Sequence, residues 1–439
     1  MDRRVLLGGV AAGLLLAITA GLYATGMIGG SATSKDQTSS TNRAPKDDGE
    51  PTSKTSVVSS ELQTEKKTGA SEAKSEVEGK PAGFTVRNAG GSVHSTEPDL
   101  KSAMQVAIGS KGHVWLDHRE PIKLTGDDAT IKIDGGPLYI RAAEGIEPVL
   151  EVEIKGAKPF LTTGIGSPLT MTGVTIIAHF DSSARLVPPV IESANRVVLD
   201  RCVFKATGKT EQARGFSIVG PSLSATGTWF DGFAQGLDIG AFSGSTVALK
   251  QCLFSLRPSA EDQQGGWALR VLNKPGGGSK TAKPTRRLSL DHCTVVGQGF
   301  MELIAFSSTL PYHVEVTGCA VHAGSLLAWA PKDGTSPPKA PALEWKGKEN
   351  VYDIQGKEWA IRSSEGGVGL PDGPTNLDTW AKLVSEESPL SPPIQFRTKV
   401  ASLSESPTPR DFLILQTDQP VGADPSVVGP KQAEAKSTR

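Results

Sequence analysis

The chain has 439 residues, of which 49 are glycine and 30 are proline, so turns must be frequent. Its formal net charge is −1, and only 5% of its residues are aromatic. Proteins that bind nucleic acid usually carry a basic excess, so this charge balance gives no support to that function. Four cysteines in a chain of this length do not make a disulfide-based scaffold.

The first 30 residues are predicted to form a membrane anchor. Arg3 and Arg4 precede an apolar stretch that begins at Val5, and no further charge occurs before Lys35. The stretch exceeds the roughly 20 residues that a helix needs to cross a bilayer, and it is longer than the apolar part of a signal peptide. The flanking arginines would stay in the cytoplasm and the rest of the chain would be exported. The alternative is a cleaved signal peptide, with the small residues at 24–26 as the cleavage site.

Two segments are predicted to be disordered. Residues 31–82 consist largely of Ser, Thr, Lys, Glu and Pro and have almost nothing to bury, which is typical of a disordered linker. Residues 423–439 are predicted to be a frayed tail. The folded domain is therefore expected to cover residues 84–422.

A short pattern recurs along this domain: an apolar residue, any residue, an apolar residue, two polar or small residues, and then a cysteine. Four copies carry the cysteine and two carry another residue in its place; the six positions are Val174, Cys202, Thr228, Cys252, Cys293 and Cys319. Their spacing of roughly 25 residues, with one longer interval, is typical of a solenoid. Alternating apolar and polar residues predict two short strands around a corner, and a third strand precedes each pair. Three strands per coil, without amphipathic helices between them, predict an all-β fold, a parallel β-helix.

The cysteines share their position with valine and threonine, which indicates a small residue in a tight interior column. Side chains stacked on neighbouring coils point the same way, and this is poor geometry for a disulfide. No C-x₂-C or H-x₃-H spacing accompanies the cysteines, and the seven histidines are scattered. We therefore expect buried, inert thiols. The alternatives are a disulfide formed after export, a metal site or a catalytic nucleophile.

Both ends of a β-helix need a cap, because open sheet edges invite aggregation. Residues 98–112 and 377–386 are predicted to form the two capping helices. The first strand after the N-terminal cap lies within VWLDHRE at 114–120, and we expect Trp115 to point into the core.

The repeat resembles the right-handed parallel β-helix, or pectin-lyase-like, superfamily over residues 84–355. The stretches GPLYIRAAEGIEPVLEV and SPLTMTGVTI, and closing segments that include ENVYD and LDTW, are similar to the exported β-helix region of bacterial membrane-anchored serine/threonine kinases. The glycine-rich loop, the His-Arg-Asp loop and the Asp-Phe-Gly motif of a kinase are missing, so kinase activity is not carried over. The resemblance implies a right-handed solenoid with one preceding transmembrane helix, on the extracytoplasmic side of a bacterial inner membrane.

One row of charges is the candidate ligand-binding surface. If the apolar residues of the third strand point inward, their neighbours point outward on one face; these neighbours are Glu192, Asp238, Arg270 and Glu302. Four charges on successive coils could form a shallow strip that binds saccharide. The competing interpretation is ordinary solvated charge on an outer face.

No complete set of catalytic residues is visible in the sequence. VWLDHRE is similar to a Trp-Ile-Asp-His stretch of pectate lyases, but no cluster of carboxylates for calcium lies near Asp117. We expect a non-enzymatic binding or structural module at the cell envelope, with a polysaccharide or an envelope protein as its partner and with no catalytic residue, cofactor, metal or nucleic acid. The alternative is a polysaccharide lyase or glycoside hydrolase of the same fold, in which inverting hydrolysis would need carboxylates about 6.5–9.5 Å apart.

Overall fold

The computed structural model describes residues 83–181, 187–208, 210, 213–241, 244–257, 266–273, 286–304, 312–330, 343–362, 375–403, 406–415 and 420–431. The predicted anchor (1–30) and the predicted linker (31–82) lie outside these ranges. The chain divides into two units, 1–75 and 76–439, and every described residue belongs to the second unit. Within the described ranges, neither α-helix combines the length and the apolar character that a membrane crossing requires.

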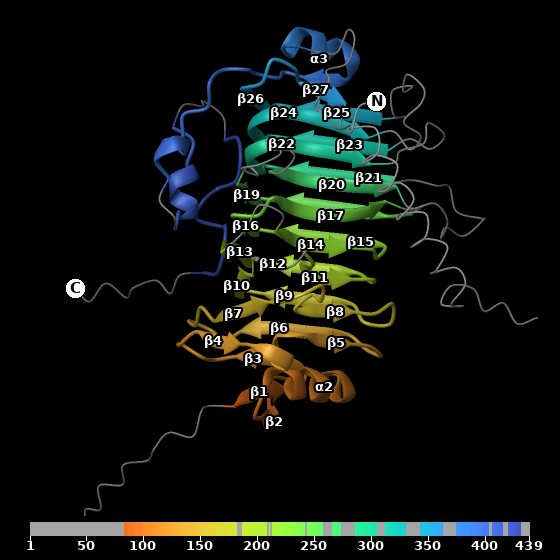
Figure 1. Cartoon of the computed structure of the whole chain (residues 1–439), viewed down its shortest axis with the longest axis vertical. Helices are drawn as coiled ribbons and strands as arrows, with labels where there is room; N and C mark the ends of the chain where they lie inside the picture. Colours follow the sequence, from red (N-terminus) through yellow and green to blue (C-terminus); the bar gives the residue numbers. More distant parts are fainter. Residues whose placement is uncertain are drawn as a thin grey trace, which may run out of the picture. The chain divides into compact units, whose positions relative to one another are not determined.

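The second unit is a parallel β-solenoid, in which each strand of a coil pairs with the equivalent strand of the next coil (Figure 1). Each coil contributes strands to three faces. Among the described residues, the first face is a 12-stranded sheet and the other two faces form one 16-stranded sheet. The second and third faces are joined because two long strands, β22 and β24, run through both of them. The predicted parallel β-helix is thus confirmed as an all-β parallel β-solenoid.

The strands of each face are given in their order along the stack. The first face comprises β2 (Val93–Glu97), β1 (Phe84–Arg87), β3 (His113–Leu116), β6 (Leu138–Ala142), β9 (Leu169–Thr172), β12 (Val197–Asp200), β15 (Ser222–Thr226), β18 (Thr246–Lys250), β21 (Arg286–Asp291), β23 (Tyr312–Thr317), β25 (Leu343–Lys348) and β28 (Ser385–Glu387). The second face comprises β4 (Ile122–Leu124), β7 (Val149–Ile154), β10 (Thr175–Phe180), β13 (Val203–Gly208), β16 (Trp229–Asp231), β19 (Leu253–Ser255), the first halves of β22 (Thr294–Ile304) and β24 (Ala320–Ala330), and β26 (Val351–Ile354). The third face comprises β5 (Ile131–Ile133), β8 (Leu161–Thr163), β11 (Pro189–Ser193), β14 (Arg214–Ile218), β17 (Gln235–Ala241), β20 (Trp267–Asn273), the second halves of β22 and β24, and β27 (Ala360–Arg362).

The core is a set of apolar columns that run along the stack. Strict alternation sends every second side chain of a strand inward, and pairing in register places equivalent side chains on top of one another. The rings of Phe204, Phe230 and Phe254 form one such column, with centroids 5.3 and 5.0 Å apart and nearly parallel planes. All three rings are fully buried, as the period of the sequence predicts for Phe204 and Phe254.

Both ends of the described solenoid carry a short helix. At the N-terminal end, α2 (Leu100–Ser110) starts at the N-cap Asp99, whose carboxylate accepts a hydrogen bond from the Ser102 amide. One side of α2 is buried against the first coils, and β1 and β2 pair antiparallel beside it. At the other end, α3 (Leu377–Leu383) buries Trp380 edge-to-face against Trp345. The two predicted capping helices are therefore present, each somewhat shorter than the sequence predicted. The described residues also contain three 3₁₀ turns: η1 (Gly126–Ala129), η2 (Val400–Ser402) and η3 (Pro409–Phe412).

A left-handed residue turns the chain at the corner between the first and second faces. The corner residues with positive φ are Gly173, Arg201, Gly227, Gln251, His292, Gly318 and Glu349. Four of these are not glycine, although this conformation is unfavourable for other residues. The backbone amides of these four residues donate hydrogen bonds to carbonyls of the next coil. For example, the His292 amide donates to the carbonyl of Thr317 at 2.8 Å. Stacking of the coils therefore stabilises the corner, and the following residue enters the interior.

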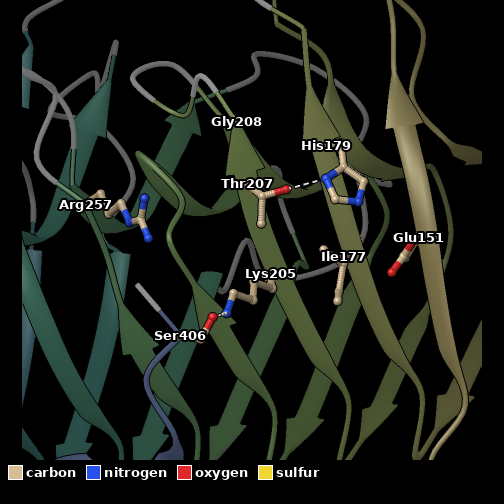
Figure 2. A pocket seen from close by; sticks show the side chains of 8 residues that line it. All are labelled: Glu151, Ile177, His179, Lys205, Thr207, Gly208, Arg257 and Ser406. Carbon is tan, nitrogen blue, oxygen red and sulfur yellow. Dashed lines mark hydrogen bonds between the residues drawn. The ribbon is translucent and has the colours of Figure 1, made fainter. Parts of the chain in front are cut away.

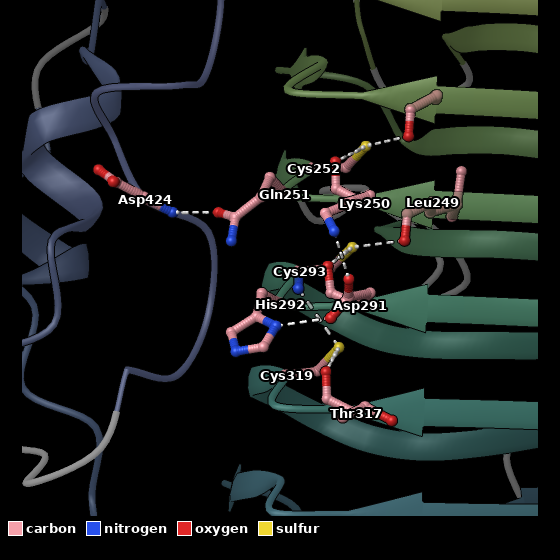
Figure 3. Close-up of polar contacts among 11 residues, drawn as sticks. Leu249, Lys250, Gln251, Cys252, Asp291, His292, Cys293, Thr317, Cys319 and Asp424 are labelled. Carbon is pink, nitrogen blue, oxygen red and sulfur yellow. Dashed lines mark hydrogen bonds and ion pairs between the residues drawn. The ribbon is translucent and has the colours of Figure 1, made fainter.

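The residue after each corner is the position that the cysteines share, and all four cysteines are buried and unpaired as disulfides. The amide of Cys293 donates to Cys319 Sγ at 3.3 Å, and the amide of Cys319 donates to Asn350 Oδ1 at 2.9 Å. Backbone hydrogen bonds similarly link Thr228 to the Cys252 thiol. Figure 3 shows the thiols in turn donating to carbonyls of the stack, as Cys252 does to the carbonyl of Lys250 at 3.4 Å.

These contacts explain why the position accepts sulfur and oxygen. Each corner leaves an amide that points along the column, and a side chain of the next coil must accept its hydrogen bond. The column is therefore a hydrogen-bonded ladder as well as a packing column, and Asn350 extends it beyond the last cysteine. Burial raises the pKa of Cys202 to about 12, although a backbone hydrogen bond with Val174 acts in the opposite direction. A thiol of this kind is not a nucleophile at neutral pH.

The valine of the ladder has a separate explanation. Val174 pairs in register with Pro148 of the preceding coil, because the neighbouring residues Thr175 and Val149 are partners. Proline has no amide N–H, so this is the one step at which the next coil does not need to supply an acceptor. An apolar side chain at Val174 therefore leaves no amide without a partner.

The prediction for Trp115 was wrong. In β3 the side chains of Val114 and Leu116 are buried, so alternation turns Trp115 outward, where it is half-buried beneath the Arg87 guanidinium. The phase of the strand, which Val114 and Leu116 set, decides which side chains point inward.

The C-terminal segment packs along the outside of the second face (Figure 1). Apolar side chains that point outward from this face contact Phe396, Phe412 and Val428. The Gly422 amide donates to the carbonyl of Gly318, and the Gly429 amide donates to the carbonyl of Gly227. The predicted disordered tail thus needs a correction, because residues 423–431 are docked on the solenoid; residues 432–439 lie outside the described ranges.

Candidate functional site

The four predicted site residues lie in one row of the third face. In this row Glu192 pairs with Ser217, Ser217 with Asp238, Asp238 with Arg270, and Arg270 with Glu302. Asp238, Arg270 and Glu302 are therefore on three successive coils. The sequence suggested four successive charges, but β14 adds a coil with a serine between Glu192 and Asp238.

The predicted inward neighbours explain why this row faces outward. Ile191, Ile239, Leu269 and Leu303 are all buried in the core. Each precedes or follows a residue of the row, so the alternation of the strand directs the charged side chains away from the interior.

The two downstream carboxylates of the row are nevertheless shielded from water. Asp238 is only 2% exposed and Glu302 only 8% exposed. A carboxylate removed from water needs a cation or several hydrogen bonds to remain charged. The interpretation of the row as solvated surface charge is therefore wrong for these two residues.

Arginines on neighbouring strands provide the compensating charge. Arg214 Nη1 lies 3.1 Å from Asp238 Oδ2, and the same guanidinium donates two hydrogen bonds to the carbonyl of Val187. Arg270 Nε lies 3.5 Å from Glu302 Oε2, and its Nη1 donates to Gln235 Oε1 at 3.1 Å. Each pair joins two adjacent coils. These contacts hold the row in register and leave the arginines, rather than the carboxylates, partly open to solvent.

A groove of about 250 Å³ lies beside this row. Its polar residues are Glu192, Arg214 and Ser217. The remaining lining residues are apolar: Ala157, Pro159, Val187, Pro188 and Pro189. A charged floor beside a proline-rich wall can hold a ligand that has both polar and apolar surfaces.

Arg214 was missed by the sequence reasoning. It is the first residue of β14 and was not among the predicted site residues. The register pairs Arg214 with Gln235, directly beside the predicted row. The sequence did contain a signal for Arg214: it begins a third-face strand, one coil before the outward Asp238.

A second groove of about 440 Å³ lies on the second face, beside the docked C-terminal segment (Figure 2). Its lining residues are Glu151, Ile177, His179, Lys205, Thr207, Gly208, Arg257 and Ser406. His179 Nδ1 and Thr207 Oγ1 share a hydrogen bond of 2.6 Å, and Lys205 Nζ donates to Ser406 Oγ at 3.2 Å. The groove is bordered by more cationic than anionic side chains, which favours an anionic group as its occupant.

Asp231 lies behind this second groove. Asp231 is a strand residue that is only 4% exposed. Burial raises the pKa of its carboxyl group, while the hydrogen bond from Ser255 and the charge of Lys205 act in the opposite direction. Ser255 donates to Asp231 at 2.7 Å and accepts a hydrogen bond from the Trp229 indole. This chain of contacts fixes Asp231 within the wall and keeps it out of the open part of the groove.

The carboxylates of the third face are poorly placed to act as an acid–base pair. Asp238 and Glu302 are two coils apart, which corresponds to roughly 10 Å between their backbones at the usual strand spacing. Each carboxylate is already bound to an arginine, whereas a general acid must keep a proton to give to the leaving group. Among the described residues, no group of three or more His, Cys, Asp or Glu side chains is arranged to hold a metal ion. The chain as a whole matches no known protein family and no curated protein at a significant level.

Proposed function

We propose that the chain is a non-enzymatic binding module of the cell envelope and that the groove on the third face holds its ligand. The anchoring and the export of this module rest on the sequence of the first 30 residues. The right-handed, pectin-lyase-like character of the solenoid rests on the resemblance of its repeats. A polysaccharide is the ligand we favour, because a long flat face with a shallow groove suits an extended polymer.

One observation carries this proposal: the carboxylates Asp238 and Glu302 are consumed in ion pairs with Arg214 and Arg270. The row therefore contributes a rigid, pre-organised surface rather than a free acid and a free base. Glu192 and the exposed part of Arg214 remain at the groove, where they can bind hydroxyl or charged groups of a ligand.

The alternative function is a polysaccharide lyase or glycoside hydrolase of the same fold. The observation in its favour is the order carboxylate, guanidinium, carboxylate on three successive coils, at Asp238, Arg270 and Glu302. A ligand that separated Arg270 from Glu302 would release both groups for chemistry.

A glycan array probed with the full chain, together with a lyase and reducing-end assay on every glycan that binds, separates the two functions. Binding without turnover supports the module. Turnover that is lost in Asp238→Ala or Arg270→Ala would establish the enzyme instead.

Two variants locate the binding surface. We expect Glu192→Gln and Arg214→Gln to weaken glycan binding by about tenfold, as for the loss of one charged hydrogen bond. Lys132→Gln is the matched control, because Lys132 lies in the same row, two coils before Glu192, but is exposed and does not line the groove. Unchanged binding in both groove variants would remove the third face from the proposal.

A further inference from the structure

The outward turn of Trp115 creates a second surface, at the N-terminal end of the first face. Five side chains meet there on three adjacent strands, and we call them the aromatic–cationic patch: Arg87, His113, Trp115, Tyr139 and Arg141. Each of the five is half-buried, and each points away from the core. This surface shares no residue with the third-face groove.

Register and stacking arrange the patch. Arg87 pairs with His113 across β1 and β3, and Trp115 pairs with Arg141 across β3 and β6. The imidazole of His113 stacks on the Tyr139 ring at 4.5 Å, with only 13° between the planes. The guanidinium carbon of Arg87 lies 5.1 Å from the centre of the Trp115 ring. Two arginines therefore flank a wall of three aromatic rings.

The guanidinium groups of the patch lack acceptors for some of their N–H donors. The Nε atoms of Arg87 and Arg141 are both buried, and neither has a hydrogen-bond partner. Arg87 makes one hydrogen bond, from Nη1 to the carbonyl of Gly91, at 3.3 Å. A buried donor without an acceptor costs free energy, so the protein alone does not satisfy these two guanidinium groups.

No carboxylate among the described residues forms an ion pair with Arg87, His113 or Arg141. Asp117 follows β3 at the edge of the patch, and its carboxylate is bonded to the Thr85 hydroxyl at 3.4 Å. Burial and the neighbouring Arg141 lower the pKa of His113, so its ring is neutral at pH 7 and offers one N–H donor. The patch thus presents two positive charges and several donors to solvent.

We propose that the aromatic–cationic patch binds a sulfate or phosphate ester group carried on a saccharide. Arg87 and Arg141 lie on the two sides of β3, and a guanidinium group binds a tetrahedral oxyanion through two hydrogen bonds at once. The half-exposed rings of Trp115 and Tyr139 give the sugar ring a flat apolar surface to pack against.

A nucleic acid strand is the other ligand that combines aromatic stacking with anionic groups. Such strands are held by many phosphate contacts, whereas the patch contains only two arginines and the chain as a whole has a net charge of −1. A saccharide with sparse anionic esters fits this limited charge better.

The test measures binding of sulfated maltohexaose, unmodified maltohexaose and an oligothymidylate of equal length to the full chain by calorimetry. We expect the sulfated sugar to bind at least about tenfold more tightly than the other two, as for one charged hydrogen bond. Inorganic phosphate should compete only weakly, because it lacks the sugar ring that packs on the aromatic side chains. If inorganic phosphate bound as tightly as the sulfated sugar, the patch would be a site for a free anion, and the saccharide part of the proposal would be wrong. Tighter binding of oligothymidylate, or no binding of the sulfated sugar, would overturn the proposal.

Variants separate this site from the third-face groove. Arg141→Gln and Trp115→Phe should each weaken sulfated-sugar binding by about tenfold or more without changing the melting temperature. Lys250→Gln is the matched control, since Lys250 is exposed on the same face, several coils away, and is paired with Asp291. Loss of binding in Arg214→Gln but not in Arg141→Gln would refute this inference while leaving the proposed function intact.

Discussion

Two columns run along the same solenoid, and they are built by different physical rules. The interior ladder behind the corner contains Cys252, Cys293, Cys319 and Asn350, and each member accepts a hydrogen bond from a backbone amide of the preceding coil. The outer row on the third face contains charges that are joined in pairs by arginines from neighbouring strands.

The difference lies in what each column demands of its residues. The interior demand comes from the backbone, so an acceptor is needed at every coil whose preceding coil presents an amide N–H, and in the described ladder only Pro148 removes that need. The outer demand comes from the neighbouring side chain, so one position can hold a carboxylate in one coil and a guanidinium in the next. Repetition therefore identifies structural positions, and interruption of the repeat identifies positions where function can be sought.

The largest expected effect is at the end of the interior ladder. Asn350 is fully buried; it accepts from the Cys319 amide and donates to the Val316 carbonyl at 2.9 Å. Asn350→Leu should lower the free energy of unfolding by about 3 kcal/mol, because it leaves an amide and a carbonyl without partners. Chemical denaturation measures this change.

Asn350→Asp is the matched variant for this test. It keeps the acceptor for the Cys319 amide but loses the donor to the Val316 carbonyl. The decrease in its free energy of unfolding at pH 7 therefore also includes the cost of burying a charge. A loss below about 1 kcal/mol for Asn350→Leu would show that water satisfies the ladder.

A smaller effect is expected in the outer row. Arg214→Met should destabilise the protein by about 2 kcal/mol, because Asp238 would remain buried without its cation. Asp238→Asn in the same background should recover much of that loss, since the neutral amide needs no counter-charge. Thermal and denaturant unfolding of the single and double variants measure this coupling. Additive losses in the double variant would mean that the ion pair does not stabilise the row.

The role of the thiols can be tested by two substitutions at one position. If the column is only an apolar stack, Cys252→Val should be better tolerated than Cys252→Ser. The ladder predicts the reverse order, because a serine oxygen can accept from Thr228 and donate to Lys250, whereas valine can do neither. We expect Cys252→Val to cost about 1–2 kcal/mol and Cys252→Ser to cost less. If denaturant unfolding shows that Cys252→Val is more stable than Cys252→Ser, the column is held together by apolar packing alone.

Much of this architecture could be predicted from the sequence, because a repeated position leaves a repeated pattern. The cysteine spacing located the corners, and the alternation of apolar residues around Ile239 and Leu303 fixed the outward direction of Asp238 and Glu302. The partners of these carboxylates could not be predicted in the same way. Which arginine reaches Asp238 depends on how strands from different coils align, and no single repeat contains that information.

Two other differences between the prediction and the structure have local causes. Trp115 was predicted to point into the core, whereas the two flanking residues, Val114 and Leu116, set the opposite phase for β3. The docked segment beyond residue 422 was missed because it buries few apolar residues of its own. Its attachment depends on backbone hydrogen bonds to the corners, which a composition-based argument does not detect.

The smallest predicted effect tests the one exception within the ladder. Pro148→Ala would introduce an amide N–H at the step where Val174 offers no acceptor, and we expect a loss of about 1 kcal/mol, part of it from added freedom in the unfolded chain. Val174→Thr should be neutral or harmful in the natural chain but stabilising in the Pro148→Ala background, because the threonine hydroxyl can accept the new hydrogen bond. A double-mutant cycle on unfolding free energies measures the coupling. If Val174→Thr has the same effect in both backgrounds, the ladder does not extend to this coil, and Val174 is selected by packing alone.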